Sequence, residues 1–117
     1  MSQEESRTGL GLIRIHKNVI SSVAYLATLE IDGVKRVFGG LRSSVLGLLS
    51  KEGSSAIRVD ISKNEEVKVD IPLFIKYGFN IPDIASRVQE NVRQALEKMT
   101  SLSIKEVNIN VQGIERN

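Results

Sequence analysis

Two aspartates, Asp60 and Asp70, are the residues whose types and spacing come closest to a chemical site. Both fall on the polar faces of segments that alternate apolar and polar residues, which is the pattern of paired strands. Side by side, the two carboxylates could bind a hard cation or raise each other's pKa. Basic residues share these polar faces and favour ordinary cross-strand charge pairs instead, namely Arg58, Lys68 and Lys76. We therefore predict neither a metal site nor catalytic carboxylates here.

Other groups that could support catalysis or cofactor binding are sparse. His16 is the only histidine, and the absence of cysteine excludes thiolate catalysis, disulfides and zinc–thiolate sites. The pair Gly9-x-Gly11 precedes a predicted strand instead of following one, and no Walker lysine follows Gly39-Gly40, so neither predicts a phosphate site. Catalysis needs complementary groups held together in one site. The sequence therefore predicts a protein that is not an enzyme and has no cofactor.

The bulk properties indicate one globular domain in the cytoplasm. The chain has 117 residues, 41% of them hydrophobic and 26% charged, which is ordinary for a single domain. Its net charge of +2 comes from 16 basic and 14 acidic residues that are well mixed, so no polybasic anchor or nucleic-acid tail is apparent. The polar, acidic start is unlike a secretory signal, and no apolar run approaches the roughly 20 residues of a membrane helix. We expect membrane association only through a partner.

Hydrophobic periodicity predicts an alternation of strands and helices. The predicted strands are 9–15, 34–38, 56–62, 66–77 and 104–113, and the predicted helices are 16–31 and 80–100. The link at 62–65 has hairpin length, and Asn80 followed by Pro82 is typical of a helix start. Gly33 is expected to adopt a left-handed conformation after the first helix. The segment 41–53 could form two turns of amphipathic helix or a loop.

Each helix carries an apolar stripe, and each clear strand has one apolar and one polar face. The predicted core stripes are Val19, Ile20, Val23, Ala24, Ala27 and Ile31 in the first helix, and Ile84, Val88, Val92, Leu96 and Met99 in the second. The expected fold is an α+β two-layer sandwich, β-α-β-(α)-β-β-α-β, with helices on one face of a mixed sheet. Residues 10–114 are expected to form the domain, between a disordered tail at 1–9 and a C-terminal tail at 115–117.

An apolar surface outside the core stripe favours protein binding. Tyr25 and Leu29 lie away from that stripe on the first helix. With Val45, Leu46 and Leu49 of the uncertain segment, they could form a surface for self-association or for a protein partner. Alternatively, residues 41–49 fold over Tyr25 and Leu29 and complete the core. The sequence leaves both interpretations open.

Nucleic-acid binding is the rival hypothesis. The strand and helix order is similar to that of RNA-recognition sheets, and the sequence pI is about 9.0. Such sheets stack bases on exposed aromatic side chains. Among the outward positions of the predicted strands only Phe74 could stack, and Asp60 and Asp70 would repel phosphate. An RNA-binding module is therefore the alternative function, and protein binding is favoured.

A set of motifs in fixed order resembles the alkaline shock, or envelope stress response, family of bacterial proteins. The motifs are Val19-x-x-x-Val23-Ala24-x-x-Ala27, Asp32-Gly33-Val34, Tyr77-Gly78, the run Ile81 to Val92, Ala95, Met99-Thr100, Leu102, and the run Glu106 to Ile114. The resemblance covers about residues 10 to 114. Ser101 departs from it, because the family usually has glycine there. Serine would be strained if the position needs a positive φ, unless the turn adjusts.

The resemblance implies a stress-response role without catalytic residues. Members are linked to cell-envelope and alkaline stress, often self-associate, and are often held at the membrane by a membrane-protein partner. Some relatives are connected with the control of fatty-acid synthesis. From the resemblance we expect a self-associating scaffold or adaptor, a homo-oligomer in the cytoplasm, that binds a membrane-anchored or enzyme partner.

Overall fold

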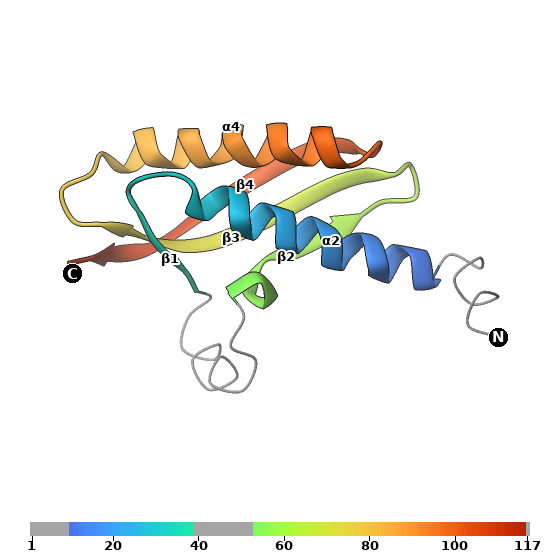
Figure 1. The fold of residues 1–117 in the computed structure, drawn as a ribbon, viewed down its shortest axis with the longest axis horizontal. Coiled ribbons are helices and arrows are strands. Elements are labelled where there is room, and N and C mark those ends of the chain that lie inside the picture. The colour runs from blue at the N-terminus through green and yellow to red at the C-terminus, as the bar shows by residue number, and fades with distance from the viewer. Residues whose placement is uncertain (1–9, 39–52, 117) are drawn as a thin grey trace.

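The computed structural model describes residues 10–38 and 53–116, in which two helices cover one face of a four-stranded sheet (Figure 1). In chain order the elements are α2 (Leu10–Leu29), β1 (Val34–Val37), the short 3-10 helix η1 (Gly53–Ala56), β2 (Arg58–Ile61), β3 (Glu66–Lys76), α4 (Ile81–Met99) and β4 (Ser103–Glu115). The predicted α+β fold is confirmed. The predicted tail at 1–9 and all but the last residue of the uncertain segment 41–53 lie outside the described residues.

The sheet is built around β3, with which the other three described strands pair. β4 pairs with β3 in parallel along its whole length, from the Glu66–Ser103 pair to the Lys76–Glu115 pair. β1 and β2 pair antiparallel with opposite ends of β3. Because β4 takes one edge of β3, β1 and β2 share the other. The sheet is therefore mixed, as predicted.

The first predicted element is wrong. The segment 9–15 was expected to be a strand, but α2 begins at Leu10 and runs without a break to Leu29. Leu10, Leu12 and Ile13 alternate only loosely, and no proline separates them from the helical pattern that follows. Once a helix is nucleated, each added residue gains a backbone hydrogen bond. Extending α2 backwards therefore outweighs the cost of Gly11, about 1 kcal/mol relative to alanine.

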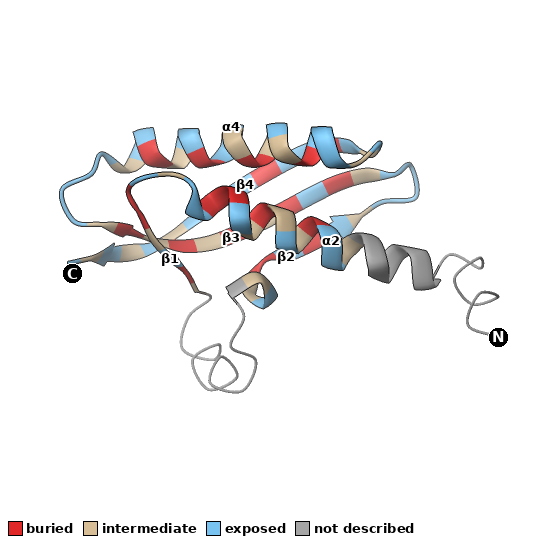
Figure 2. Ribbon diagram, viewed as in Figure 1, coloured by how far each residue is buried: buried red, intermediate tan, exposed pale blue. Residues whose placement is uncertain are grey.

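The core lies between the helices and the sheet (Figure 2). It contains the alternate residues Val67, Val69, Ile71, Leu73 and Ile75 of β3, with Ile20, Ala24 and Ala27 of α2 and Ile84, Val88, Val92 and Leu96 of α4. Two predicted core residues are exposed instead, Val19 and Met99. Each lies at the edge or end of its stripe, where it lines a hollow beside the helices.

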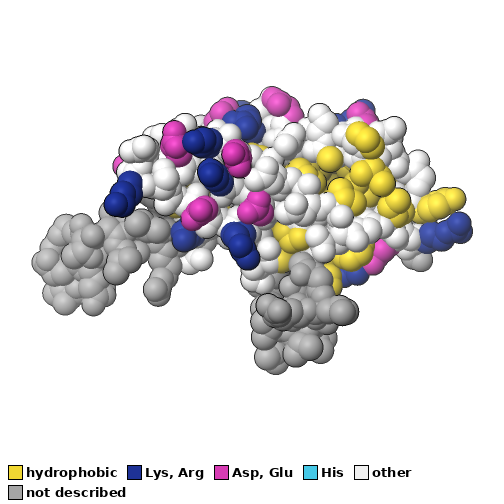
Figure 3. Space-filling view, turned by 180° about the vertical axis from the view of Figure 1, so that it is seen from behind, with side chains coloured by type: hydrophobic (Ala, Val, Ile, Leu, Met, Phe, Trp, Pro, Cys, Tyr) yellow, Lys and Arg dark blue, Asp and Glu magenta, His cyan; other side chains and the backbone are white. Residues whose placement is uncertain are grey.

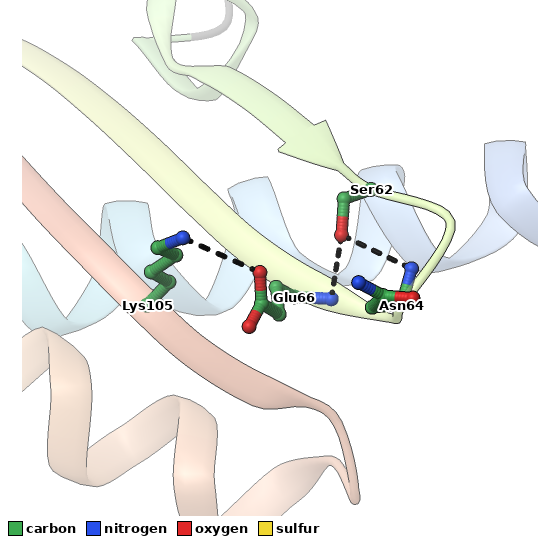
Figure 4. Close-up of polar contacts among 4 residues, drawn as sticks. All are labelled: Ser62, Asn64, Glu66 and Lys105. Atoms are coloured by element: carbon green, nitrogen blue, oxygen red, sulfur yellow. Dashed lines mark hydrogen bonds and ion pairs between the residues drawn. The ribbon is translucent and has the colours of Figure 1, made fainter.

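Among the described links, the turn between β2 and β3 follows local sequence rules. Ser62 Oγ accepts hydrogen bonds from the backbone N–H groups of Asn64 and Glu66, each at 3.2 Å, and so closes the β2–β3 hairpin (Figure 4). An ion pair between Lys105 and Glu66, 3.4 Å apart, joins β4 to the same end of β3. Among the described non-glycine residues, only Glu65 has a positive φ. Ser101 is therefore not strained.

The start of α4 gives a direct stability test. Asn80 Oδ1 accepts a hydrogen bond of 2.9 Å from the N–H of Asp83, as a cap should. We expect Asn80→Ala to lower the free energy of unfolding by about 1 kcal/mol, because that N–H loses its partner. Urea denaturation followed by circular dichroism measures this loss. Ser86→Ala, on the exposed surface of the same helix, is the control and should lose nothing. Equal stability of the two variants would contradict the assigned cap.

Candidate functional site

A groove runs along the helix layer between α2 and α4, which lie side by side in antiparallel directions (Figure 1). Asn91 Nδ2 donates hydrogen bonds to the carbonyl oxygen of Ala27 and to Glu30 Oε1, both at 2.8 Å, and so ties the helices together at one end. The groove has a volume of about 390 Å³ and is lined by Val23, Leu26, Ala27, Glu30, Asn91, Gln94, Ala95, Lys98 and Met99. At its other end, Val19, Met99 and residues 100–102 line a second hollow of about 240 Å³.

The groove presents apolar side chains to solvent. Leu26 is 62% exposed and Met99 63%, and Val19, which lines the second hollow, is 40% exposed. Val23 and Ala95 are partly buried and pack against the core beneath them. A contiguous exposed apolar surface with a polar rim is typical of a protein interaction site. The geometry therefore suits the binding of an apolar surface from another protein chain.

The predicted surface around Tyr25 and Leu29 lies on α2 beside the groove. At 100° per residue, these two side chains point away from Val23 and Ala27, but Leu29 lies only about 60° from Leu26 and so adjoins the outer edge of the groove. Leu29 is 41% exposed, whereas Tyr25 is partly buried and packs against the core. The other three predicted members, Val45, Leu46 and Leu49, lie outside the described residues.

Sequence reasoning missed Leu26 and assigned Met99 to the core. The signal available was the spacing of Val19 and Leu26, which lie seven residues apart and so on one side of the helix. That spacing indicates an apolar side. It does not indicate whether a neighbouring helix covers it.

The two aspartates do not face each other. The β2–β3 register sets Arg58 opposite Asp70 and Lys68 opposite Asp60, so each aspartate has a basic residue opposite it, as predicted. Asp70 Oδ1 also accepts a hydrogen bond of 3.0 Å from Asn108 Nδ2 of β4. Within residues 10–38 and 53–116, no group of three or more histidine, cysteine, aspartate or glutamate side chains is placed to hold a metal ion.

An arginine covers the aromatic side chains on the outward face of the sheet. The Arg36 guanidinium lies 4.7 Å from the ring centroid of Phe38 and 4.5 Å from that of Phe74. Its Nε and Nη2 atoms donate to the two carboxylate oxygens of Glu115, at 3.0 and 2.6 Å. These hydrogen bonds lower the pKa of Glu115 and raise the pKa of Arg36. Because the guanidinium already stacks on both rings, neither ring offers both of its faces to a base.

Seen from the side opposite to Figure 1, the surface is divided by side-chain type (Figure 3). Hydrophobic side chains gather over one half of the molecule, and basic and acidic side chains are interspersed over the other (Figure 3). The phosphate backbone of a nucleic acid binds best to a uniformly positive surface. The half with interspersed charges therefore does not favour nucleic-acid binding.

In the described part of the chain, no helix combines the length and the apolar character needed to cross a bilayer.

Comparisons with known proteins agree with this fold. The model of the alkaline shock protein 23 family, described by a cell envelope-related function, matches residues 5–116. The chain is 34% identical to the uncharacterized protein YqhY of Bacillus subtilis, over 98% of this chain and 85% of YqhY. It is 27% identical to a stress response regulator gls24 homolog of Streptococcus pyogenes serotype M3, over 90% of this chain but 59% of that relative.

Among solved structures, the MamM CTD superposes with a TM-score of 0.52. The superposition covers 86% of this chain and 98% of the MamM CTD, at 13% sequence identity. At that identity the likeness concerns the fold alone.

Proposed function

Because this chain belongs to the alkaline shock protein 23 family, which has a cell envelope-related function, we propose that it is a non-catalytic adaptor of the envelope stress response. It acts by binding proteins, including copies of itself. The observation that carries the proposal is the exposure of two leucines on α2, Leu26 in the groove and Leu29 beside it. These two leucines are three residues apart, so the two apolar surfaces adjoin on the exposed side of α2, and in this proposal each takes a different chain.

In this proposal the surface around Leu29 takes the partner. The partner surface comprises Tyr25 and Leu29; the sequence assigns Val45, Leu46 and Leu49 to it as well, and these three lie outside the described residues. Its occupant is a membrane-anchored protein or an enzyme, and the first of these would hold the domain at the membrane. The chemistry of the partner separates the two roles that the family suggests, because an envelope protein indicates stress response and an acyl-group enzyme indicates control of fatty-acid synthesis.

We expect Leu29→Glu to weaken partner binding at least about tenfold, because a charge would replace an apolar contact on this surface. The tagged full chain is crosslinked in native cells, and its partner is identified by mass spectrometry. The purified partner is then titrated against wild-type and variant chains. Tyr25 is left unchanged because its packing against the core would confuse a binding defect with a folding defect.

The matched control is Ser86→Glu, which adds the same charge at an exposed position of α4. It should bind the partner as the wild type does. If Leu29→Glu and Ser86→Glu both retained the full affinity, the partner would not bind at this surface. If the wild-type chain captured no protein specifically, the adaptor role itself would fail.

A further inference from the structure

We propose that the groove between α2 and α4 is the docking site for a second copy of this chain, related to the first by a two-fold axis that crosses the groove. The inference rests on the self-association in the proposed function and assigns it a surface, a partner and a symmetry. It leaves the surface of Tyr25 and Leu29, which adjoins the groove at Leu26, to another protein. Three properties of the groove support the proposal: its exposed apolar side chains, the charged residues at its ends, and the opposite sign of those two charges.

The apolar contribution comes from Leu26 and Met99. Both side chains are more than three-fifths exposed, and they face the groove from opposite helices. Val19 extends the same surface beyond Met99 into the second hollow. Two such grooves set face to face would withdraw six of these side chains from water, three from each copy. The same patch on both chains forms the contact, as a two-fold dimer requires.

The charges of the groove lie at opposite ends. Glu30 is held beside Asn91 by the hydrogen bond between their side chains, at 2.8 Å. Lys98 comes seven residues after Asn91, which places it about 10 Å further along the axis of α4. Within the described residues neither Glu30 nor Lys98 has an ion-pair partner. The groove is therefore negative at one end and positive at the other.

This polarity selects one of two possible symmetric arrangements. A two-fold axis parallel to the groove would set Glu30 against Glu30 and Lys98 against Lys98 of the second copy, and both contacts are repulsive. A two-fold axis perpendicular to the groove makes the groove of the second copy run in the opposite direction. Glu30 of each copy then meets Lys98 of the other. Complementary charges fix the register of an interface and exclude the wrong one. The crossing axis gives two ion pairs around an apolar centre.

Charge reversal tests this geometry directly. Sedimentation equilibrium of the full chain, from about 1 to 100 µM, measures the dimer dissociation constant. We expect Glu30→Lys and Lys98→Glu each to raise it about tenfold, because each replaces two attractive contacts by two repulsive ones. The double variant should return to within about threefold of the wild type. That recovery would also show that loss of the hydrogen bond between Asn91 and Glu30 is not the cause.

Leu26→Glu tests the apolar centre and should raise the dissociation constant at least about tenfold. Circular dichroism checks that each variant is folded, and Leu26→Ser replaces it if the glutamate variant is not. Ser86→Glu is the control and should dimerise normally. A wild-type chain that stays monomeric to 100 µM would overturn the proposal, as would a dimer insensitive to Leu26→Glu or a double variant that does not recover.

The outcomes also separate this inference from the adaptor proposal. Leu29→Glu should lose the partner and keep the dimer, whereas Lys98→Glu, on the other helix of the groove, should weaken the dimer and still bind the partner. A chain that binds its partner but never dimerises would refute the groove dimer and leave the adaptor role standing. A chain that dimerises through the groove but captures no other protein would do the reverse.

Discussion

Replacing Gly33 by alanine is expected to lower the free energy of unfolding by about 3 kcal/mol, from backbone strain and overpacking together. Gly33 has a φ of +112°, a conformation that residues with a side chain rarely adopt. A Cβ atom there would lie 2.7 Å from Ile84 Cδ1 and 2.9 Å from Phe79 Cδ2. Ile84 is buried in the core and cannot move aside freely. Urea denaturation followed by circular dichroism measures the loss.

Gly78→Ala is the matched control for this variant. Gly78 also has a positive φ, +95°, but a Cβ atom at this position would meet nothing within 4 Å. Its substitution should therefore cost only the backbone strain, about 1 to 2 kcal/mol. The difference between the two variants measures the steric part at Gly33. If both lost the same stability, the contact with Ile84 and Phe79 would carry no energy.

A second large loss is expected from Leu96→Ala, about 3 kcal/mol of unfolding free energy, because a fully buried leucine would leave a cavity. Leu96 is fully buried in the last full turn of α4, and its backbone carbonyl also accepts the hydrogen bond of the Thr100 N–H, at 3.0 Å. The side chain lies between the helix layer and the sheet. Equilibrium denaturation measures the effect, at a chain concentration low enough to keep the protein monomeric.

Met99→Ala is the informative control, because this residue lies on the same helix only three positions away. Its side chain is exposed in the groove, so the substitution should change the stability of the monomer by about 0.5 kcal/mol or less. The sequence assigned Met99 and Leu96 to one core stripe. Equal losses for the two variants would restore that assignment and remove Met99 from the groove.

Local patterns predicted much of the fold. The alternation in β3 is so regular that its apolar face could only be buried. Asn80 and Pro82 marked the start of α4 because capping depends on neighbouring residues alone. The strand predicted at 9–15 failed because a short, loosely alternating apolar run fits a helix as well as a strand. β4 runs past its predicted end at residue 113 to Glu115, which pairs with Arg36 of β1.

The candidate site could be predicted only in part. The sequence placed an apolar surface on α2 and named Leu29, which the structure leaves partly exposed. It could not identify the groove, because Leu26 and Met99 come from helices more than fifty residues apart in the chain. Their exposure depends on how closely α2 and α4 approach. The hydrogen bonds from Asn91 to Ala27 and Glu30 set that approach at one end.

The sequence by itself therefore determined what short-range physics controls: most of the strands, the second helix with its cap, the turn glycine at Gly33 and the absence of cysteine chemistry. The tertiary structure alone decided that β4 pairs with β3 in parallel, that Ile84 and Phe79 close over Gly33, and that Leu26 and Met99 remain uncovered. The physical reason is the range over which each kind of interaction acts along the chain. Capping and alternation act between neighbouring residues, whereas strand pairing, steric contact and exposure depend on which distant segments pack together.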